Sequence, residues 1–128
     1  MAIIVQKYGG TSVGSLERIN DVARKVKSAC EDGNQIVVVV SAMSGETNRL
    51  ISLASQINLN PDPRELDVLI TTGEQVTIAL LALALQNLGC KARSYTGSQV
   101  KIQTDNAHGK ARIVDIDHSK VNTDLKNG

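Results

Sequence analysis

The apolar residues of the chain fall into short blocks, some with the spacing of a strand and others with that of a helix. Residues 36–40 are all apolar and β-branched, which predicts a central strand that is buried on both faces. Residues 3–6 predict a shorter strand. Between these two strands, apolar side chains recur at every third or fourth position, and this predicts a helix that ends near Gly33.

The middle of the chain carries the longest helical pattern. Apolar positions over residues 50–57 predict a second helix. Residues 62–65 (DPRE) combine an N-cap acid, a proline at the first helical position and a glutamate three residues after the cap, so a third helix starts here. We expect this helix to kink or break at Gly73, and the pattern resumes over residues 74–88.

The last third of the chain predicts shorter elements. These are a strand at 91–96, a turn at Gly97 and Ser98, a weaker extended stretch at 100–104, a loop at His108 and Gly109, a strand at 112–116 and a weak helix at 119–126. Strands that alternate with helices imply right-handed crossovers, so we predict an α/β fold with a mainly parallel sheet. A further strand would normally follow the last helix, and we therefore expect the chain to be part of a longer protein.

Composition and charge exclude several classes of protein. The chain has 14 basic and 13 acidic residues without long runs of one sign, which gives no case for binding nucleic acid or a membrane surface. Cys30 and Cys90 have neither CxxC spacing nor a histidine companion, so they predict neither a metal site nor a disulfide framework. The N-terminus lacks a signal-peptide pattern, and the most apolar run is shorter than the roughly 20 residues that a bilayer needs. We expect a cytoplasmic protein.

Two junctions after predicted strands carry glycines and hydroxyls, and ligands of open α/β sheets bind at such junctions. The first contains Lys7, Gly9, Gly10, Thr11 and Ser12, and the second is the run SAMSGET at 41–47. Backbone N–H groups ahead of a helix attract anions, and a lysine adds a full charge, so the first junction is a candidate phosphate site. It matches neither a P-loop nor GxGxxG. A Gly-Gly pair is also an ordinary turn, but Lys7 at the end of an apolar strand has little packing reason to be there.

Glu74 is the other candidate, because it lies in an otherwise apolar helical stretch. A buried carboxylate costs free energy unless it has a cationic partner. Two interpretations stay open at this point. The side chain complements the N-terminal dipole of a resumed helix, or it holds an ammonium group of a ligand.

Five motifs together resemble the aspartate kinases, which are members of the amino-acid kinase superfamily. Their order and spacing agree over essentially the whole chain. The motifs are KYGGTSVGS at 7–15, VSAMSGETNRL at 40–50, LITTGEQVT at 69–77, SYTGSQ at 94–99 and HGKARIVDID at 108–117.

The resemblance implies a three-layer α/β/α fold and transfer of the ATP γ-phosphate to L-aspartate, giving 4-phospho-L-aspartate for lysine, threonine and methionine synthesis. It assigns the phosphates of ATP to Lys7, Tyr8, Gly9 and Gly10, with Lys7 as the catalytic group. The substrate aspartate would be held by Ser41 and Thr47, and its ammonium by Glu74. Mg²⁺ is expected with ATP, although no ligand for it can be named in this chain.

The resemblance also places residues 1–128 in the N-terminal portion of the kinase domain, without the ATP-binding C-terminal half and the regulatory ACT domains. We expect little or no activity from this chain alone, and a homo-oligomer or a complex with ACT subunits for the intact protein. Two alternatives stay open. One is another amino-acid kinase (glutamate 5-kinase, acetylglutamate kinase or bacterial uridylate kinase), which would not be expected to carry SAMSGETN followed by TTGEQ. The other is a non-catalytic regulatory or assembly module.

Overall fold

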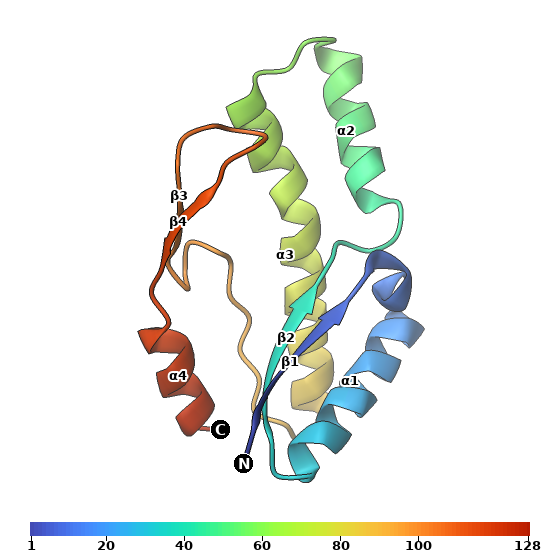
Figure 1. The fold of residues 1–128 in the computed structure, drawn as a ribbon. Helices are drawn as coiled ribbons and strands as arrows, with labels where there is room; N and C mark the ends of the chain where they lie inside the picture. The colour runs from blue at the N-terminus through green and yellow to red at the C-terminus, as the bar shows by residue number, and fades with distance from the viewer.

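The computed structural model describes residues 1–128, and helices and strands alternate along most of the chain (Figure 1). The elements in order are β1 (Ile3–Tyr8), the 3₁₀ helix η1 (Gly10–Val13), α1 (Leu16–Glu31), β2 (Gln35–Val40), α2 (Glu46–Ile57), α3 (Pro63–Asn87), β3 (Ile102–Thr104), β4 (Ile113–Ile116) and α4 (Ser119–Lys126). The predicted strands at 3–6 and 36–40 and the helix start at residues 62–65 are confirmed. The second helix begins at Glu46, one turn before the apolar run at 50–57.

β1 and β2 form a parallel pair, with α1 as the crossover between them. The register runs from Ile3 opposite Gln35 to Tyr8 opposite Val40. α1 and α3 pack together behind this pair and cover one of its faces (Figure 1). On the opposite face Val5 is 65% exposed and Val39 is 47% exposed. The predicted α/β class with a parallel sheet is confirmed.

The core lies between the sheet and the two long helices. Ser15 caps α1, since its hydroxyl accepts a hydrogen bond from the Arg18 N–H at 3.2 Å. The apolar stripe of α1 then faces inward at the spacing that the sequence predicts. The buried core residues are Val13, Ile19, Val22, Ala23, Val26, Val40, Leu81 and Leu85.

α3 is one continuous helix, so the predicted break at Gly73 is wrong. The predicted start is confirmed, because the Asp62 carboxylate accepts hydrogen bonds from the N–H groups of Arg64 and Glu65. Gly73 is buried, and a β-carbon there would lie 3.0 Å from the Ala42 β-carbon. The glycine therefore serves close packing against the segment after β2, and the i to i−4 ladder of the helix continues through it.

By length and composition alone, α3 is apolar enough to cross a membrane. Part of this apolar surface is covered within the chain. Leu81 and Leu85 lie in the core with residues of α1, and α2 packs against the helix. Val76 is 49% exposed and Leu83 is 61% exposed, so the other side of α3 is open in this chain.

The predicted strand at 91–96 is wrong. These residues run extended, but no backbone hydrogen bond pairs residues 91–95 with a strand, and Ala92 accepts only from the Gln86 side chain, at 3.0 Å. Apart from the parallel sheet, β3 and β4 form a separate antiparallel hairpin. α4 lies beside the start of β2, where the Gln35 amide donates to the Leu125 carbonyl at 3.0 Å.

Candidate active site

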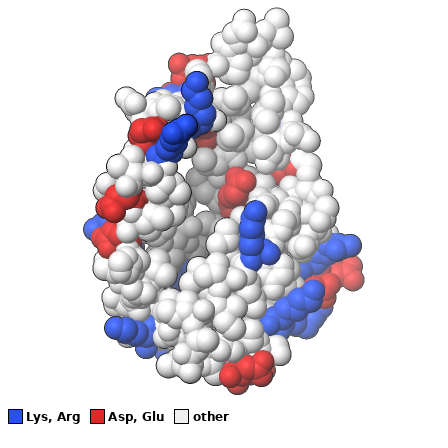
Figure 2. All heavy atoms as spheres, in the orientation of Figure 1, with Lys and Arg blue, Asp and Glu red and all other residues white.

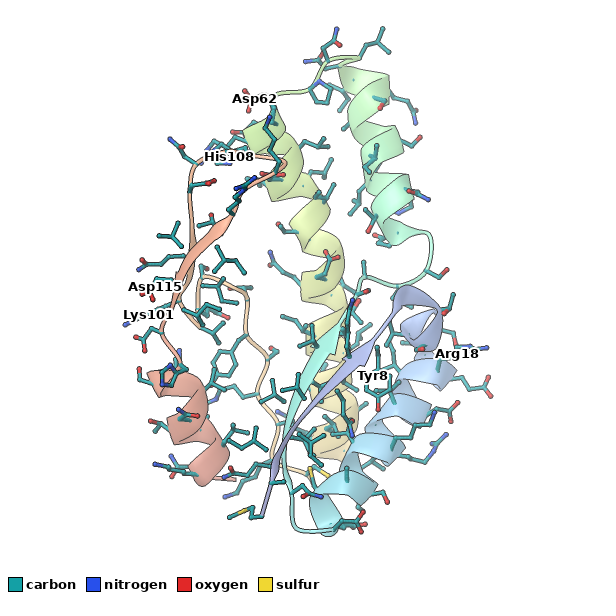
Figure 3. All side chains as sticks on the ribbon, in the orientation of Figure 1. Tyr8, Arg18, Asp62, Lys101, His108 and Asp115 are labelled. Carbon is teal, nitrogen blue, oxygen red and sulfur yellow. The ribbon has the colours of Figure 1, made fainter.

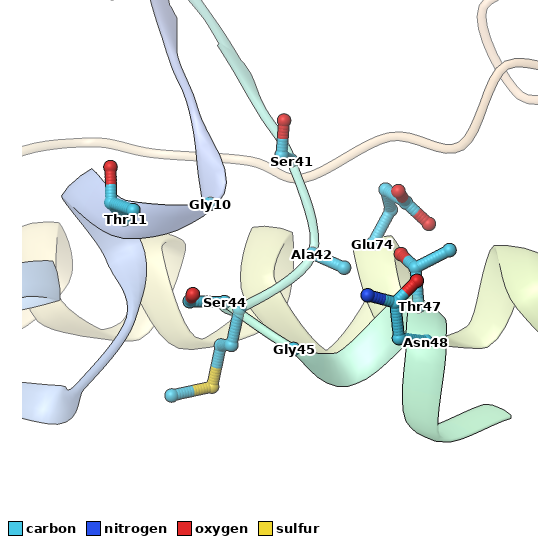
Figure 4. A pocket seen from close by; sticks show the side chains of 10 residues that line it. Gly10, Thr11, Ser41, Ala42, Ser44, Gly45, Thr47, Asn48 and Glu74 are labelled. Carbon is cyan, nitrogen blue, oxygen red and sulfur yellow. The ribbon is translucent and has the colours of Figure 1, made fainter. Parts of the chain in front are cut away.

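The chain segments that leave β1 and β2 are joined by backbone hydrogen bonds. Ser41 N–H donates to the Tyr8 carbonyl and Ser44 N–H donates to the Gly10 carbonyl, each at 3.1 Å. An open pocket of about 390 Å³ lies over this junction (Figure 4). It is lined by Gly10, Thr11, Ser41, Ala42, Met43, Ser44, Gly45, Thr47, Asn48 and Glu74. The candidate ligand site therefore lies at the carboxyl ends of the parallel strands, as the sequence predicts.

The two adjacent glycines of the first junction differ in their surroundings. A β-carbon on Gly10 would lie 3.0 Å from the Ala42 carbonyl oxygen, so Gly10 permits the close approach of the two junctions. A β-carbon on Gly9 would meet nothing within 4 Å. The Gly9 N–H also has no hydrogen-bond acceptor in the chain. The backbone at Gly9 is thus bare and open to an approaching group.

The second junction ends at the N-terminus of α2. Gly45 precedes the helix with φ of +81°, a left-handed conformation that glycine adopts without steric cost. The N–H groups of Thr47 and Asn48 have no acceptor within the helix, which is usual for a first turn. These groups and the helix dipole favour a negative charge at this edge of the pocket.

Glu74 is the only charged side chain that lines the pocket. It is half-buried, and no ion pair or hydrogen bond engages its carboxylate. The nearby acid Glu46 is different, since Arg49 on the next turn of α2 donates two hydrogen bonds to it, at 2.9 and 2.7 Å. These bonds hold the pKa of Glu46 below its ordinary value. The pocket therefore keeps one carboxylate free to accept an external cation.

The hydroxyls of Ser41 and Thr47 line the same pocket as Glu74, and Figure 4 shows Thr47 close to Glu74. Neither hydroxyl has a hydrogen-bond partner within the chain. Asn48 joins them from the first turn of α2, although the sequence did not single it out. The signal for it was available, because residue 48 follows Thr47 in the first turn of a predicted helix at a ligand-binding edge.

Lys7, Tyr8 and Gly9 do not line this pocket, whose lining begins at the next residue, Gly10. Lys7 is exposed, pairs across the sheet with Val39 and makes no ion pair or hydrogen bond. The Tyr8 side chain points the other way, packs on the core and donates to Gln6 Oε1 at 3.0 Å. The structure thus brings together Gly10, Ser41, Thr47 and Glu74, and it leaves the Lys7 side chain exposed and unpaired on the sheet.

A metal-binding cluster is not formed by the side chains of this chain. No group of three or more His, Cys, Asp or Glu side chains lies close enough together to hold an ion. Near the pocket, only Glu74 offers a free carboxylate.

The parallel strand pair and the pocket at its carboxyl end define an open α/β protein with a candidate site at the strand ends. The model of the amino acid kinase family matches residues 2–128, and the chain belongs to that family. It is 65% identical to the aspartate kinase of Pseudomonas putida and 53% identical to the aspartokinase of Geobacillus stearothermophilus, over 128 residues in both cases. These alignments cover 100% of this chain and 31% of each relative, so the chain spans about a third of their length.

Solved structures agree with this assignment. The crystal structure of aspartate kinase from Synechocystis superimposes with a TM-score of 0.74 at 57% identity, covering 77% of this chain and 17% of that one. Escherichia coli aspartokinase III in complex with aspartate and ADP gives a TM-score of 0.84 over 100% of this chain and 39% of that chain. At 20% identity, the second comparison supports the fold alone.

Proposed function

We propose that the whole protein is an aspartate kinase, which transfers the γ-phosphate of ATP to the side-chain carboxylate of L-aspartate and yields 4-phospho-L-aspartate. The observation that carries this proposal is the unpaired Glu74 carboxylate in a pocket whose other edge presents unpaired N–H groups. A pocket of this kind suits an amino acid, which carries an ammonium and a carboxylate on one carbon. The 65% identity to an aspartate kinase supports the choice of amino acid.

The acceptor end of the site is formed by Glu74, Ser41 and Thr47. Glu74 accepts the ammonium of aspartate, since it is the only charged group that lines the pocket. Ser41 and Thr47 donate hydrogen bonds to the carboxylates, together with the free N–H groups at the start of α2. The side-chain carboxylate of aspartate is itself the nucleophile, so no residue of the protein has to form a covalent intermediate.

The phosphate end is formed by Lys7, Gly9 and Gly10. The Lys7 ammonium lies free at the end of β1 and neutralises charge on the transferred phosphate. The bare N–H of Gly9 donates a hydrogen bond to a phosphate oxygen, and Gly10 keeps the two junctions close. Tyr8 contributes through its backbone, because its carbonyl holds Ser41 in place. Mg²⁺ bound with ATP would neutralise further phosphate charge. No side chain of residues 1–128 can be named as its ligand.

We further propose that residues 1–128 form the N-terminal portion of the kinase domain of a cytoplasmic enzyme. The remaining ATP-binding half and the regulatory ACT domains then belong to the rest of the protein or to partner subunits, in a homo-oligomer or a mixed complex. The share of the curated relatives that the chain spans, 31%, supports this division. On this proposal the chain alone has little or no kinase activity.

A coupled assay of ADP release by the whole protein tests the proposal. We expect turnover with L-aspartate and ATP, and none with L-glutamate, N-acetyl-L-glutamate or UMP, which are the acceptors of the related kinases. The 128-residue chain is assayed beside it as a second sample. Turnover with one of the other acceptors and none with L-aspartate would overturn the assignment. Full turnover by the chain alone would overturn the division of the site.

A further inference from the structure

The two cysteines of the chain lie at the same end of the molecule, although they are far apart in the sequence. Cys30 is in the last turn of α1, and Cys90 comes shortly after the C-terminal end of α3. α1 and α3 pack together, and both end in the lower part of Figure 1. The Lys27 ammonium donates to the Leu88 carbonyl at 3.3 Å, which joins the ends of the two helices.

Both cysteine side chains lie beside the core. Cys90 packs against the core cluster, and its N–H donates to the Leu85 carbonyl at 3.0 Å. Cys30 follows the buried Val26 by one helical turn and therefore lies on the same face of α1. Burial raises the pKa of the Cys30 thiol, and the charges of Cys90 and then Glu31 raise it further. Since Cys90 acts directly on Cys30, the two thiols are neighbours in the folded chain.

The cysteine pair is accessible from solvent and remote from the candidate pocket. Cys30 is exposed and Cys90 is partly buried, and both are free thiols. They lie at the amino end of β2, whereas the pocket lies at the carboxyl ends of the strands. Figure 3 shows Tyr8 and Arg18 near that other end of β1 and α1. Figure 2 shows basic and acidic groups mixed over α1, so a charged reagent meets no surface of one sign there.

We propose that Cys30 and Cys90 form a reversible disulfide bond, which fastens the end of α1 to the segment after α3 when the protein meets a small disulfide oxidant such as oxidised glutathione. The exposed Cys30 thiolate attacks one sulfur of the oxidant, which gives a mixed disulfide and releases one glutathione thiolate. The Cys90 thiolate then attacks the Cys30 sulfur and releases the second. The two cysteines lose two electrons and two protons, and the oxidant takes them up as two molecules of glutathione.

The bond would act on stability and leave the pocket as it is. It closes a loop of about sixty residues, and a cross-link over a loop of this length restricts the unfolded chain strongly. The first step is slow at neutral pH, because the raised pKa of Cys30 leaves little thiolate. The second step is fast, since Cys90 is already beside the mixed disulfide.

The test treats the whole protein with oxidised glutathione, blocks the remaining thiols with iodoacetamide and maps the unreduced tryptic peptides by mass spectrometry. We expect a linked pair of peptides that contains Cys30 and Cys90 and that disappears after treatment with dithiothreitol. Cys90→Ser should instead keep one glutathione on Cys30. The matched control is Ser28→Cys combined with Cys30→Ser, which moves the thiol to an exposed position on the opposite side of α1. This control should give no linked pair.

The second readout is the thermal unfolding temperature of the same samples. We expect the oxidised parent protein to unfold several degrees above its reduced form, and oxidation to leave Cys90→Ser unchanged. Absence of the linked pair in the parent protein would overturn the proposal. Equal linking in the Ser28→Cys control would also overturn it, because the folded arrangement would not then select the pair. A linked protein with an unchanged or lower unfolding temperature would show that the bond does not fasten the two helix ends.

Discussion

Gly73 of α3 lies directly against Ala42, the residue at the centre of the second junction. A β-carbon at position 73 would stand 3.0 Å from the Ala42 β-carbon, closer than two such atoms normally approach. A β-carbon on Gly10 would likewise stand 3.0 Å from the Ala42 carbonyl oxygen. Ala42 is therefore enclosed between two glycines, and this arrangement fixes where β1, the start of α2 and α3 meet.

The first prediction concerns this contact. Gly73→Ala should destabilise the protein by about 1 kcal/mol or more, because overpacking a tight contact outweighs the gain in helix propensity. Urea unfolding measures the change. The double variant Ala42→Gly with Gly73→Ala makes room for the new methyl group and should recover stability. An increase in stability from Gly73→Ala alone would contradict the close contact.

The second prediction separates the roles of Gly9 and Gly10. Gly10→Ala should lower stability by about 1 kcal/mol or more, since the new methyl group would press on the Ala42 carbonyl. Gly9→Ala has open space and φ of −75°, so stability should change little. Its effect should appear in the KM for ATP, because the methyl group shields the bare backbone. An ATP KM that matches the parent protein would exclude phosphate contact at Gly9.

The third prediction concerns Lys7. Lys7→Ala in the whole protein should lower kcat roughly 100-fold or more, the cost typical of losing one preorganised electrostatic group at a developing charge. Stability should hardly change, because the side chain is exposed and unpaired. Lys25→Ala, at an exposed lysine of α1, serves as the control. Normal turnover by Lys7→Ala would show that Lys7 does not contact the transferred phosphate.

The fourth prediction concerns Glu74. Glu74→Gln should raise the KM for L-aspartate by roughly 10- to 100-fold, since a charge-assisted hydrogen bond to the ammonium is lost. The KM for ATP should stay near that of the parent protein. Steady-state kinetics with each substrate varied in turn gives both values. If both stay unchanged, Glu74 serves only the helix and binds no ammonium.

The fifth prediction concerns the base of the hairpin. Hydrogen bonds from Ser119 and then from Lys101 lower the pKa of Asp117 to about 2. The pKa of Asp117 is lower in the folded protein than its ordinary value. The ionised carboxyl group therefore stabilises the folded state fully at pH values above the ordinary pKa, and this stabilisation is lost as the pH falls through about 2. Carbon-13 NMR of the Asp117 carboxyl group should therefore give a midpoint near 2, and Lys101→Met should raise it. A midpoint at the ordinary value in the parent protein would contradict these contacts.

Local signals in the sequence were sufficient for much of the fold. The β-branched run at 36–40 and the cap at Asp62 each act within a few residues, and both elements form where they were predicted. The strand-end rule placed Gly10, Ser41 and Thr47 at one ligand-binding edge, the resemblance to the aspartate kinases added Glu74, and the structure brings these residues together.

The errors arose where the outcome depends on contacts between distant segments. Gly73 has the local signature of a break, but its role is set by Ala42, which is remote in sequence. Residues 91–96 have strand propensity, but a strand also needs a partner with free backbone groups, and they have none. The contact of Asp67 with Gly109 leaves no local pattern at all, since neither residue is unusual where it stands.

Because α3 is unbroken, the direction in which Glu74 points is fixed relative to the direction in which Leu81 points. Glu74 faces the pocket while Leu81, two turns later, is buried beneath the sheet. Each residue turns the helix by about 100°. If one residue were inserted or deleted between these positions, the helix could keep Leu81 buried or keep Glu74 facing the pocket, but it could not do both. The length of this segment is therefore under as strict a constraint as the identity of any residue within it.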